Sequence, residues 1–283
     1  MIPSLVKDWL NENEYGEVTH IQTVGGGCIN HASRLETLSG KKFFLKYNNN
    51  APADLFVREA EGLQALSQAG GPRVPGVYLF DNNFLLMEDL SPGQRKKDFW
   101  QLLGSQLAMM HQCLSPQFGF AHDNYIGSTP QPNKWEENGF VFFAQQRLLF
   151  QARLAYDKGR LDRVEMKQVD RLVGKLDHLI PVQPASLLHG DLWSGNILSD
   201  ENGNPALIAP AVYYGWAEAE LAMMALFGNL PDVFYHAYQS TRPLDHGFEL
   251  RYPIYNLYHL INHLNLFGGG YLNSVKMILK QFS

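Results

Sequence analysis

The change of texture near Ser91-Pro92-Gly93 constrains the fold of this chain more than any other feature. Before this point, short runs of β-forming residues alternate with glycine turn signals around one amphipathic helical pattern. After it, apolar residues follow a helical spacing almost throughout. Strands gathered in one part and helices in another are typical of an α+β fold. We therefore predict two lobes, a β-rich N-terminal lobe over residues 1–90 and a mostly helical C-terminal lobe over residues 91–283.

Local patterns predict the elements within each lobe. The first lobe is expected to contain strands at residues 20–24, 31–38, 42–47, 77–80 and 84–88 and a helix at 54–68. The second lobe is expected to contain helices at residues 98–113, 140–156, 162–179, 218–227, 232–240 and 252–267, and one more after Gly268-Gly269-Gly270.

Composition excludes several classes of function. The net charge of −5 over 283 residues comes without a basic stripe, so no nucleic-acid partner is expected. No apolar run approaches the roughly 20 residues that span a bilayer, and no signal peptide is evident, so no membrane partner is expected. The 2 cysteines are too few for a disulfide framework in a chain of this length. The cytoplasm, which is reducing and rich in ATP, is the expected location.

The segment His189-Gly190-Asp191-Leu192-Trp193-Ser194-Gly195-Asn196 follows an apolar stretch and places an Asp and an Asn five residues apart. This is the spacing of a phosphotransferase catalytic loop. Asp191 is predicted to accept the proton of the attacking hydroxyl, and Asn196 to bind magnesium through its hard carbonyl oxygen. His189 is expected to support the loop backbone rather than to perform chemistry. A turn or helix-cap role is the alternative for Asn196, and the spacing disfavours it.

Three features upstream occur in the order that a kinase lobe requires. Gly25-Gly26-Gly27 lies between two predicted strands, where backbone amides can approach a polyphosphate, although a plain turn is the alternative. Lys46 ends an apolar strand, and Glu59 in the following helix would hold it against the phosphates of ATP. The alternative is an edge-strand lysine beside solvated glutamates, Glu59 or Glu61. The order of the features favours the kinase interpretation.

The connector Glu88-Asp89-Leu90 follows the apolar run Leu85-Leu86-Met87. In the kinase order, the backbone N–H and C=O groups of this connector would meet the edge of adenine, and the apolar residues would wall its ring. An edge strand that ends in a polar turn explains the composition equally well. The position of the segment in the chain favours the ATP interpretation.

With these motifs the chain resembles the fructosamine kinase (ketosamine-3-kinase) family, a branch of the protein-kinase-like fold related to aminoglycoside and choline kinases. The resemblance covers nearly the whole chain and is carried by residues 25–30, 188–196 and 210–215 and, most discriminatingly, by residues 124–133. It implies ATP and Mg²⁺ as cofactors. It also implies phosphorylation of a sugar hydroxyl on a small ketosamine, an amine-linked ketose formed by glycation. Residues 124–133 are expected near that substrate.

Ala209 departs from the family pattern where an Asp would bind the metal, because the turn Asp-Pro-Ala is here Ala209-Pro210-Ala211. A methyl group offers no oxygen to a cation. Either the protein is a weakened kinase or a nucleotide-binding pseudokinase, or another carboxylate such as Glu218 substitutes. Glu220 stands where the family has an Asp and is expected to brace the catalytic loop. An aminoglycoside- or choline-type kinase is a further alternative, which residues 124–133 disfavour.

Two other features have less specific interpretations. Cys28, in the glycine loop, either fits a turn or carries an oxidisable thiol, so a monomer and a redox-sensitive dimer both stay open. His259 and His263 lie four apart on a predicted helix, a spacing that suits two metal ligands. No third ligand is evident, and core or interface histidines are expected.

Overall fold

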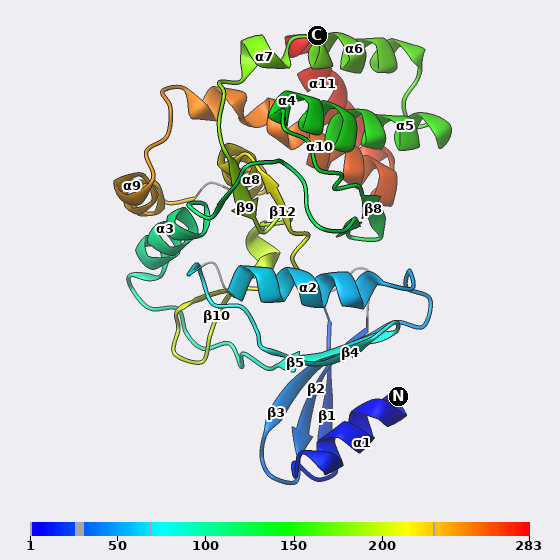
Figure 1. The fold of residues 1–283 in the computed structure, drawn as a ribbon, viewed down its shortest axis with the longest axis vertical. Helices are drawn as coiled ribbons and strands as arrows, with labels where there is room; N and C mark the ends of the chain where they lie inside the picture. Colours follow the sequence, from blue (N-terminus) through cyan, green and yellow to red (C-terminus); the bar gives the residue numbers. More distant parts are fainter. Residues whose placement is uncertain (1, 26–30, 68–69, 229) are drawn as a thin grey trace.

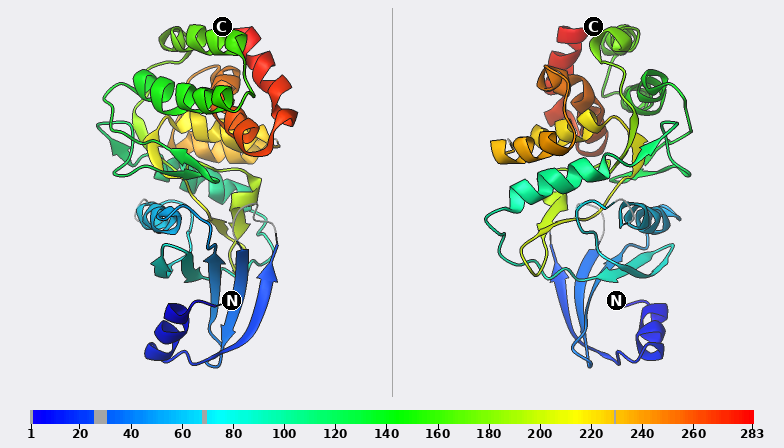
Figure 2. Two further views of the ribbon diagram at one scale, coloured as in Figure 1. Left: turned by 90° about the vertical axis from the view of Figure 1, so that its right-hand side faces the viewer. Right: turned by 60° about the vertical axis from the view of Figure 1, so that its left-hand side comes forward.

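The computed structural model describes residues 2–25, 31–67, 70–228 and 230–283. A sheet lies at one end of its long axis and most of the helices at the other (Figures 1 and 2). The N-terminal lobe consists of α1 (Ser4–Glu12), β1 (Val18–Val24), β2 (His31–Thr37), β3 (Lys42–Tyr47), α2 (Leu55–Ser67), β4 (Val77–Asp81) and β5 (Phe84–Glu88). The prediction of a bilobal α+β fold is confirmed.

The C-terminal lobe begins with α3 (Phe99–Met110), β6 (Leu114–Ser115), the hairpin of β7 (Asn124–Ile126) and β8 (Thr129–Gln131), α4 (Gly139–Phe142), the π-helical η1 (Phe143–Leu149), α5 (Phe150–Asp157), α6 (Arg163–Val173) and α7 (Leu176–Leu179). It continues with β9 (Ala185–Leu188), the 3₁₀ turn η2 (Ser194–Asn196), β10 (Ile197–Ser199), β11 (Pro205–Leu207), β12 (Tyr213–Gly215), α8 (Ala217–Leu226), α9 (Asp232–Thr241), α10 (Phe248–Phe267), the 3₁₀ turn η3 (Gly269–Tyr271) and α11 (Leu272–Phe282).

The N-terminal sheet has the strand order β1-β2-β3-β5-β4, and every neighbouring pair is antiparallel. Successive residues of a strand point to opposite faces. In β3, Phe43 and Leu45 therefore join α1 in one small core, whereas Phe44 packs against the main core with α2. Lys46 has the same parity as Phe44. The alternation thus directs Lys46 to the face of the sheet that looks toward α2 and the other lobe.

Three predicted helices differ from those in the structure, and the one at 140–156 contains the π-helical η1 between α4 and α5. α10 begins at Phe248, upstream of the predicted start at residue 252, and includes Pro253. The hydrogen bond that Pro253 cannot donate would go to Glu249, which is exposed and can bond to water instead. The predicted helix at 162–179 is divided at Gly174 into α6 and α7. Among the described residues, neither the long α10 nor any other helix is long and apolar enough to cross a membrane.

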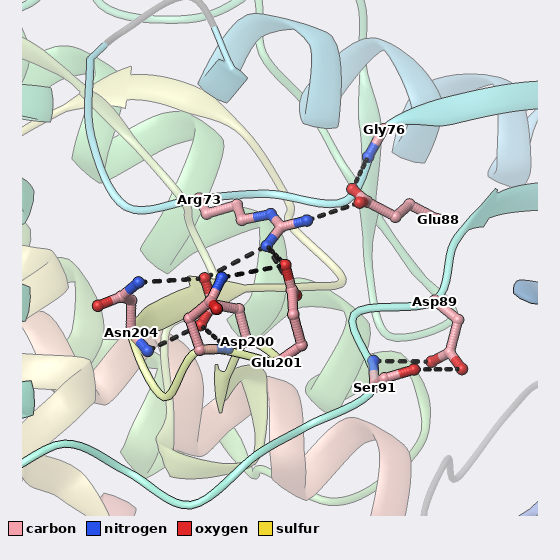
Figure 3. A network of polar contacts seen from close by, with 9 residues as sticks. Arg73, Gly76, Glu88, Asp89, Ser91, Asp200, Glu201 and Asn204 are labelled. Carbon is pink, nitrogen blue, oxygen red and sulfur yellow. Dashed lines mark hydrogen bonds and ion pairs between the residues drawn. The ribbon is translucent and has the colours of Figure 1, made fainter.

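Arg73, in the segment between α2 and β4, ties the two lobes together (Figure 3). Its guanidinium donates to Glu88 at 2.6 Å in the N-terminal lobe and to Asp200 at 3.2 Å and Glu201 at 2.8 Å in the loop between β10 and β11. Its backbone carbonyl accepts a bond from the N–H of Leu207 at 2.7 Å. One residue therefore links the end of β5 to the C-terminal lobe.

Candidate active site

A cavity of about 780 Å³ lies between the lobes and brings residues from the sheet, α2, the β7–β8 hairpin and the end of α10 to one space. Cavities of this size hold drug-sized ligands. Its apolar lining comes from both lobes and includes Val24, Ala32, Phe44, Met87, Leu198 and Ile208. The predicted residues that line it are Gly25, Lys46, Glu59, Glu88, Asp89, Leu90, Asp191 and Asn196.

Lys46 and Glu59 form an ion pair in which the Lys46 ammonium donates to Glu59 Oε1. Both side chains are largely shielded from solvent, with 13% and 11% of their surfaces exposed. Glu61 is directed elsewhere and accepts two bonds from Arg58 at 2.8 and 2.9 Å. The structure thus resolves the choice between Glu59 and Glu61 in favour of Glu59.

The loop that carries Asp191 follows β9, the buried central strand of a three-stranded sheet in the order β12-β9-β6. His189 donates from Nε2 to the carbonyl of Ile208 at 2.9 Å and accepts from the N–H of Asp191 at 3.3 Å. It therefore joins two backbone segments, as predicted. Asn196 Nδ2 donates to the Asp191 carbonyl at 2.7 Å and to its carboxylate at 3.2 Å. The side-chain oxygen of Asn196, Oδ1, is the atom that the prediction assigns to a cation.

Glu220, on α8, holds the backbone of this loop through hydrogen bonds. Its carboxylate accepts the backbone N–H of His189 at 3.0 Å and that of Gly190 at 2.8 Å. His111 lies 3.1 Å from the same carboxylate and is held in turn by Tyr238 at 2.7 Å. Burial alone would raise the pKa of Glu220, but these hydrogen bonds and nearby histidines lower it. The expected bracing role of Glu220 is therefore confirmed.

The protonation states in the loop suit a proton acceptor. Burial raises the pKa of Asp191 to about 7, against the lowering effect of the hydrogen bond from Asn196. The negative charge of Glu220 adds to the rise. Burial also lowers the pKa of His189, which favours its neutral form. A carboxylate with a pKa near neutrality can accept a proton and release it again.

Ala209 lines the cavity in a left-handed backbone conformation, with a φ of 54°. Alanine adopts this conformation rarely, whereas Asp and Asn tolerate it better because their side chains bond locally. Hydrogen bonds on both sides hold the turn, from Ile208 N–H to the Asn196 carbonyl at 3.1 Å and from Ala211 N–H to the His189 carbonyl at 2.8 Å. The turn therefore has a backbone shape that would accept an Asp at position 209.

Glu218 does not replace the missing carboxylate. Arg251 binds both of its oxygens, at 2.6 and 2.7 Å, and Tyr255 donates to it at 2.9 Å. The side chain is buried in this cluster and is absent from the lining of the cavity. The suggestion that Glu218 substitutes at position 209 is therefore wrong, because a carboxylate paired in this way belongs to the interior of the lobe.

Arginines bind the carboxylates of two connector residues. Glu88 accepts from Arg73 as described, and Asp89 accepts from Arg34 at 3.2 Å. Leu90 is buried, with 4% of its surface exposed. All three connector residues line the cavity. In the glycine loop, Gly25 lines the cavity, whereas Gly26, Gly27 and Cys28 lie outside the described residues.

Residues 124–133 fold into the β7–β8 hairpin, and only its first part reaches the cavity, through Asn124, Tyr125, Ile126 and Gly127. Gln131 and Asn133 are instead fully buried. Asn133 accepts from the buried Arg147 at 2.7 Å. Much of the family signature at 124–133 therefore lies in the packing of the lobe.

The sequence did not reveal an aromatic wall at the end of the cavity nearest α10. The ring of Trp193, in the loop that carries Asp191, lies 6.2 Å from that of Phe227 between centroids. The Phe227 ring lies 5.4 Å from His263, and the His263 ring lies 5.1 Å from Tyr271. Phe267 lies 5.8 Å from His263 and is 55% exposed. The signal in the sequence was weak because these rings come from four separate elements.

The histidine pair forms no metal centre. His259 is buried, and burial lowers its pKa to about 3, whereas His263 belongs to the aromatic wall. Within the described ranges, no group of three or more His, Cys, Asp or Glu side chains is placed to hold a metal ion.

The fold is of the protein-kinase-like class, and the cavity lies between its two lobes. An ADP-bound aminoglycoside phosphotransferase superposes with a TM-score of 0.63 over 99% of this chain and 97% of its own, and at 10% identity this likeness concerns the fold alone. The family model described as fructosamine kinase matches residues 3–283. The chain belongs to the fructosamine kinase family.

Two relatives show how closely the chain follows that family. A protein of Synechocystis sp. assigned as a ketoamine kinase is 40% identical over 269 residues, which cover 92% of this chain and 89% of the relative. The crystal structure of a protein assigned as a fructosamine-3-kinase from Thermobifida fusca has a TM-score of 0.89 and 34% identity. That match covers 99% of this chain and 98% of the other.

Proposed function

We propose that the chain binds ATP in the interlobe cavity and transfers a phosphoryl group to a sugar hydroxyl of a small ketosamine. The observation that carries this proposal is the Lys46–Glu59 pair, which lines the same cavity as Asp191 and Asn196. Phosphoryl transfer depends mainly on positioning and on neutralising charge, and these four residues supply the corresponding groups. The names of the ketoamine-kinase relatives support the choice of acceptor.

In this proposal each residue has one task. Lys46 binds the phosphates of ATP and is held in place by Glu59. The backbone of Asp89 and Leu90 meets the adenine edge, and Asp191 accepts the proton of the sugar hydroxyl. A division into lobes at residues 1–90 and 91–283 would place this connector at the hinge. ATP is abundant in the cytoplasm, which we propose as the location.

The residues present do not complete a magnesium site. Magnesium neutralises charge on the phosphates in this class of reaction and usually binds one or two carboxylates as well as the phosphates. Asn196 offers one oxygen, and Ala209 offers none. Of the other carboxylates that line the cavity, Glu59 is paired with Lys46, Glu88 with Arg73 and Asp89 with Arg34, and Asp191 is assigned to the proton of the acceptor hydroxyl. We therefore propose that turnover is slow, and that a nucleotide-binding protein without turnover is the second candidate.

The aromatic wall disfavours an aminoglycoside as the acceptor. Aminoglycosides are polycations, and a site for them needs several carboxylates to offset the cost of removing those charges from water. Beyond Asp191, the described residues at the α10 end of the cavity are aromatic, amide or aliphatic. A single secondary amine, as in a ketosamine, suits ring faces.

The test is Ala209→Asp, assayed with ATP, magnesium and a fructosamine. We expect at least a ~100-fold rise in turnover, the scale of one charge-stabilising contact in a closed site. We also expect no loss of stability, since Asp tolerates the left-handed conformation. Ala209→Asn is the matched control, because it offers one weaker oxygen without the charge. If Ala209→Asp binds ATP but stays inactive, the second candidate stands; if the chain as given is equally active, the metal argument is wrong.

A further inference from the structure

The β7–β8 hairpin makes a polar contact with the start of α2, the helix that carries Glu59. Tyr125 donates from its hydroxyl to Asp54 Oδ1 at 2.6 Å. Asp54 immediately precedes α2, and its other oxygen accepts from Arg58 at 2.9 Å. Burial and this hydrogen bond raise the pKa of Tyr125 to about 12, so the hydroxyl keeps its proton and remains a donor at physiological pH. A charged acceptor makes such a bond stronger than a neutral one would be.

The opposite side of the hairpin is fixed to the segment that follows Ala209. Asn124 Nδ2 donates to the Val212 carbonyl at 2.7 Å, and Gln131 Nε2 donates to the Ala211 carbonyl at 3.0 Å. The two amides are joined to each other at 2.7 Å. Tyr258, on α10, completes the anchor by donating to Gln131 at 2.6 Å. The hairpin is therefore a rigid part of the C-terminal lobe.

α2 also touches that segment directly. A Cβ added at Gly62 would lie 3.1 Å from Val212 Cγ2 and 3.2 Å from Pro210 Cγ, so the helix and the segment are already in close contact. α2, the hairpin and residues 209–212 thus contact one another pairwise. Glu59 lies on α2 between the Tyr125 contact at its start and the Gly62 contact.

We propose that Tyr125 is a positioning residue that holds α2 against the C-terminal lobe and so keeps Glu59 paired with Lys46 before any ligand binds. The inference rests on the proposed function, because the Lys46–Glu59 pair is taken to serve the nucleotide. Tyr125 acts through Asp54 and the helix. The arrangement requires no phosphorylation and no partner protein to bring the helix in. It also gives residues 124–133 a structural role in addition to the expected one near the acceptor.

The experiment combines two measurements on the full chain, calorimetric ADP binding and hydrogen exchange of the α2 amides. We expect Tyr125→Phe to weaken ADP binding about fivefold and to speed exchange in α2, since the lost bond is made to a charged group. Asp54→Asn should weaken ADP binding less than Tyr125→Phe does, because its amide oxygen still accepts the hydroxyl but carries no charge, and its Nδ2 cannot accept from Arg58. Tyr255→Phe is the matched control, because it loses a hydroxyl that bonds to Glu218 away from α2.

A double-mutant cycle separates positioning from general loss of stability. In a Glu59→Gln background, Tyr125→Phe should cause no further loss of ADP affinity. A full fivefold loss in that background, or exchange in α2 no faster than in Tyr255→Phe, would overturn the proposal. If the parent chain binds no ADP, the proposed function fails by itself, and the exchange comparison still decides the role of Tyr125.

Discussion

At the scale of single residues, Asp191 and Ala209 both line the cavity, but only Asp191 offers a carboxylate there. Asp191 lies in a loop that Glu220 holds by accepting the backbone N–H groups of His189 and Gly190. Glu220 performs this task although its side chain is one methylene longer than the Asp of the family pattern, because only a carboxylate between two N–H groups is needed. Ala209, by contrast, cannot take over the metal-binding role that the family pattern gives to an Asp. A cation needs an oxygen at a defined place, and a methyl group cannot supply one whatever the backbone does.

Asp191→Asn should reveal the energetic cost of the buried carboxylate. Burial raises the folded-state pKa of Asp191 to about 7, above the ordinary value of 3.8. The folded protein therefore binds this proton more tightly than the unfolded chain, so Asp191 destabilises the fold increasingly as pH rises from about 4 to 7. We expect the variant to be more stable than the parent by about 1 kcal/mol or more at pH 8, and by less at pH 5. Urea unfolding at both pH values measures this, and an equal difference at both would contradict it.

At the scale of elements, helix packing in the C-terminal lobe depends on small residues at close crossings. Gly104 lies in the middle of α3, where a Cβ would come within 2.3 Å of the Phe234 carbonyl oxygen on α9. A backbone atom cannot move aside as a flexible side chain can. The two helices therefore approach closely only because position 104 has no side chain.

Gly104→Ala should destabilise the protein by about 2–3 kcal/mol, the cost of forcing extra volume into a packed core. The sign of the change in unfolding free energy is informative, because the same substitution in an isolated helix would stabilise that helix by about 1 kcal/mol. Met109→Ala on the same helix is the control, since that side chain is 49% exposed and should change stability by at most about 0.5 kcal/mol. Thermal unfolding measures both, and a stabilised Gly104→Ala variant would show that α3 and α9 can separate freely.

At the scale of the whole molecule, Arg73 links the two lobes that line the cavity. Arg73 makes its bonds to both lobes with one planar guanidinium, whose fork of donors matches several carboxylates at once. Its ion partners Glu88 and Glu201 raise its pKa further, with the hydrogen bond to Glu201 as the largest cause. The chain of contacts runs from the end of β5 to the loop after β10 (Figure 3).

Arg73→Ala should cost about 1–2 kcal/mol of unfolding free energy, because Asp200, whose side chain is only 5% exposed, loses a partner. The estimate is kept low because Arg73 itself is 33% exposed and screened by solvent. Arg73→Lys should recover part of the loss, since an ammonium cannot reproduce the fork. Lys134→Ala, which removes an exposed ion pair with Glu136, is the control and should change little. Equal unfolding midpoints for Arg73→Ala and Lys134→Ala would contradict the role of Arg73.

The sequence alone indicated the bilobal α+β fold, the five strands and the α2 helix of the N-terminal lobe, most helices of the C-terminal lobe and the family, because alternation, helical spacing and the motif at 188–196 are local patterns. It did not predict α1 or the short strands β6 to β12. It also indicated Lys46, Glu59, Asp191 and Asn196, whose order along the chain carries information. The tertiary structure alone decided that Glu59 rather than Glu61 pairs with Lys46 and that Glu218 is committed to Arg251. It alone joined Tyr125 to α2 and assembled the aromatic wall. Such contacts connect residues tens of positions apart, and packing places them.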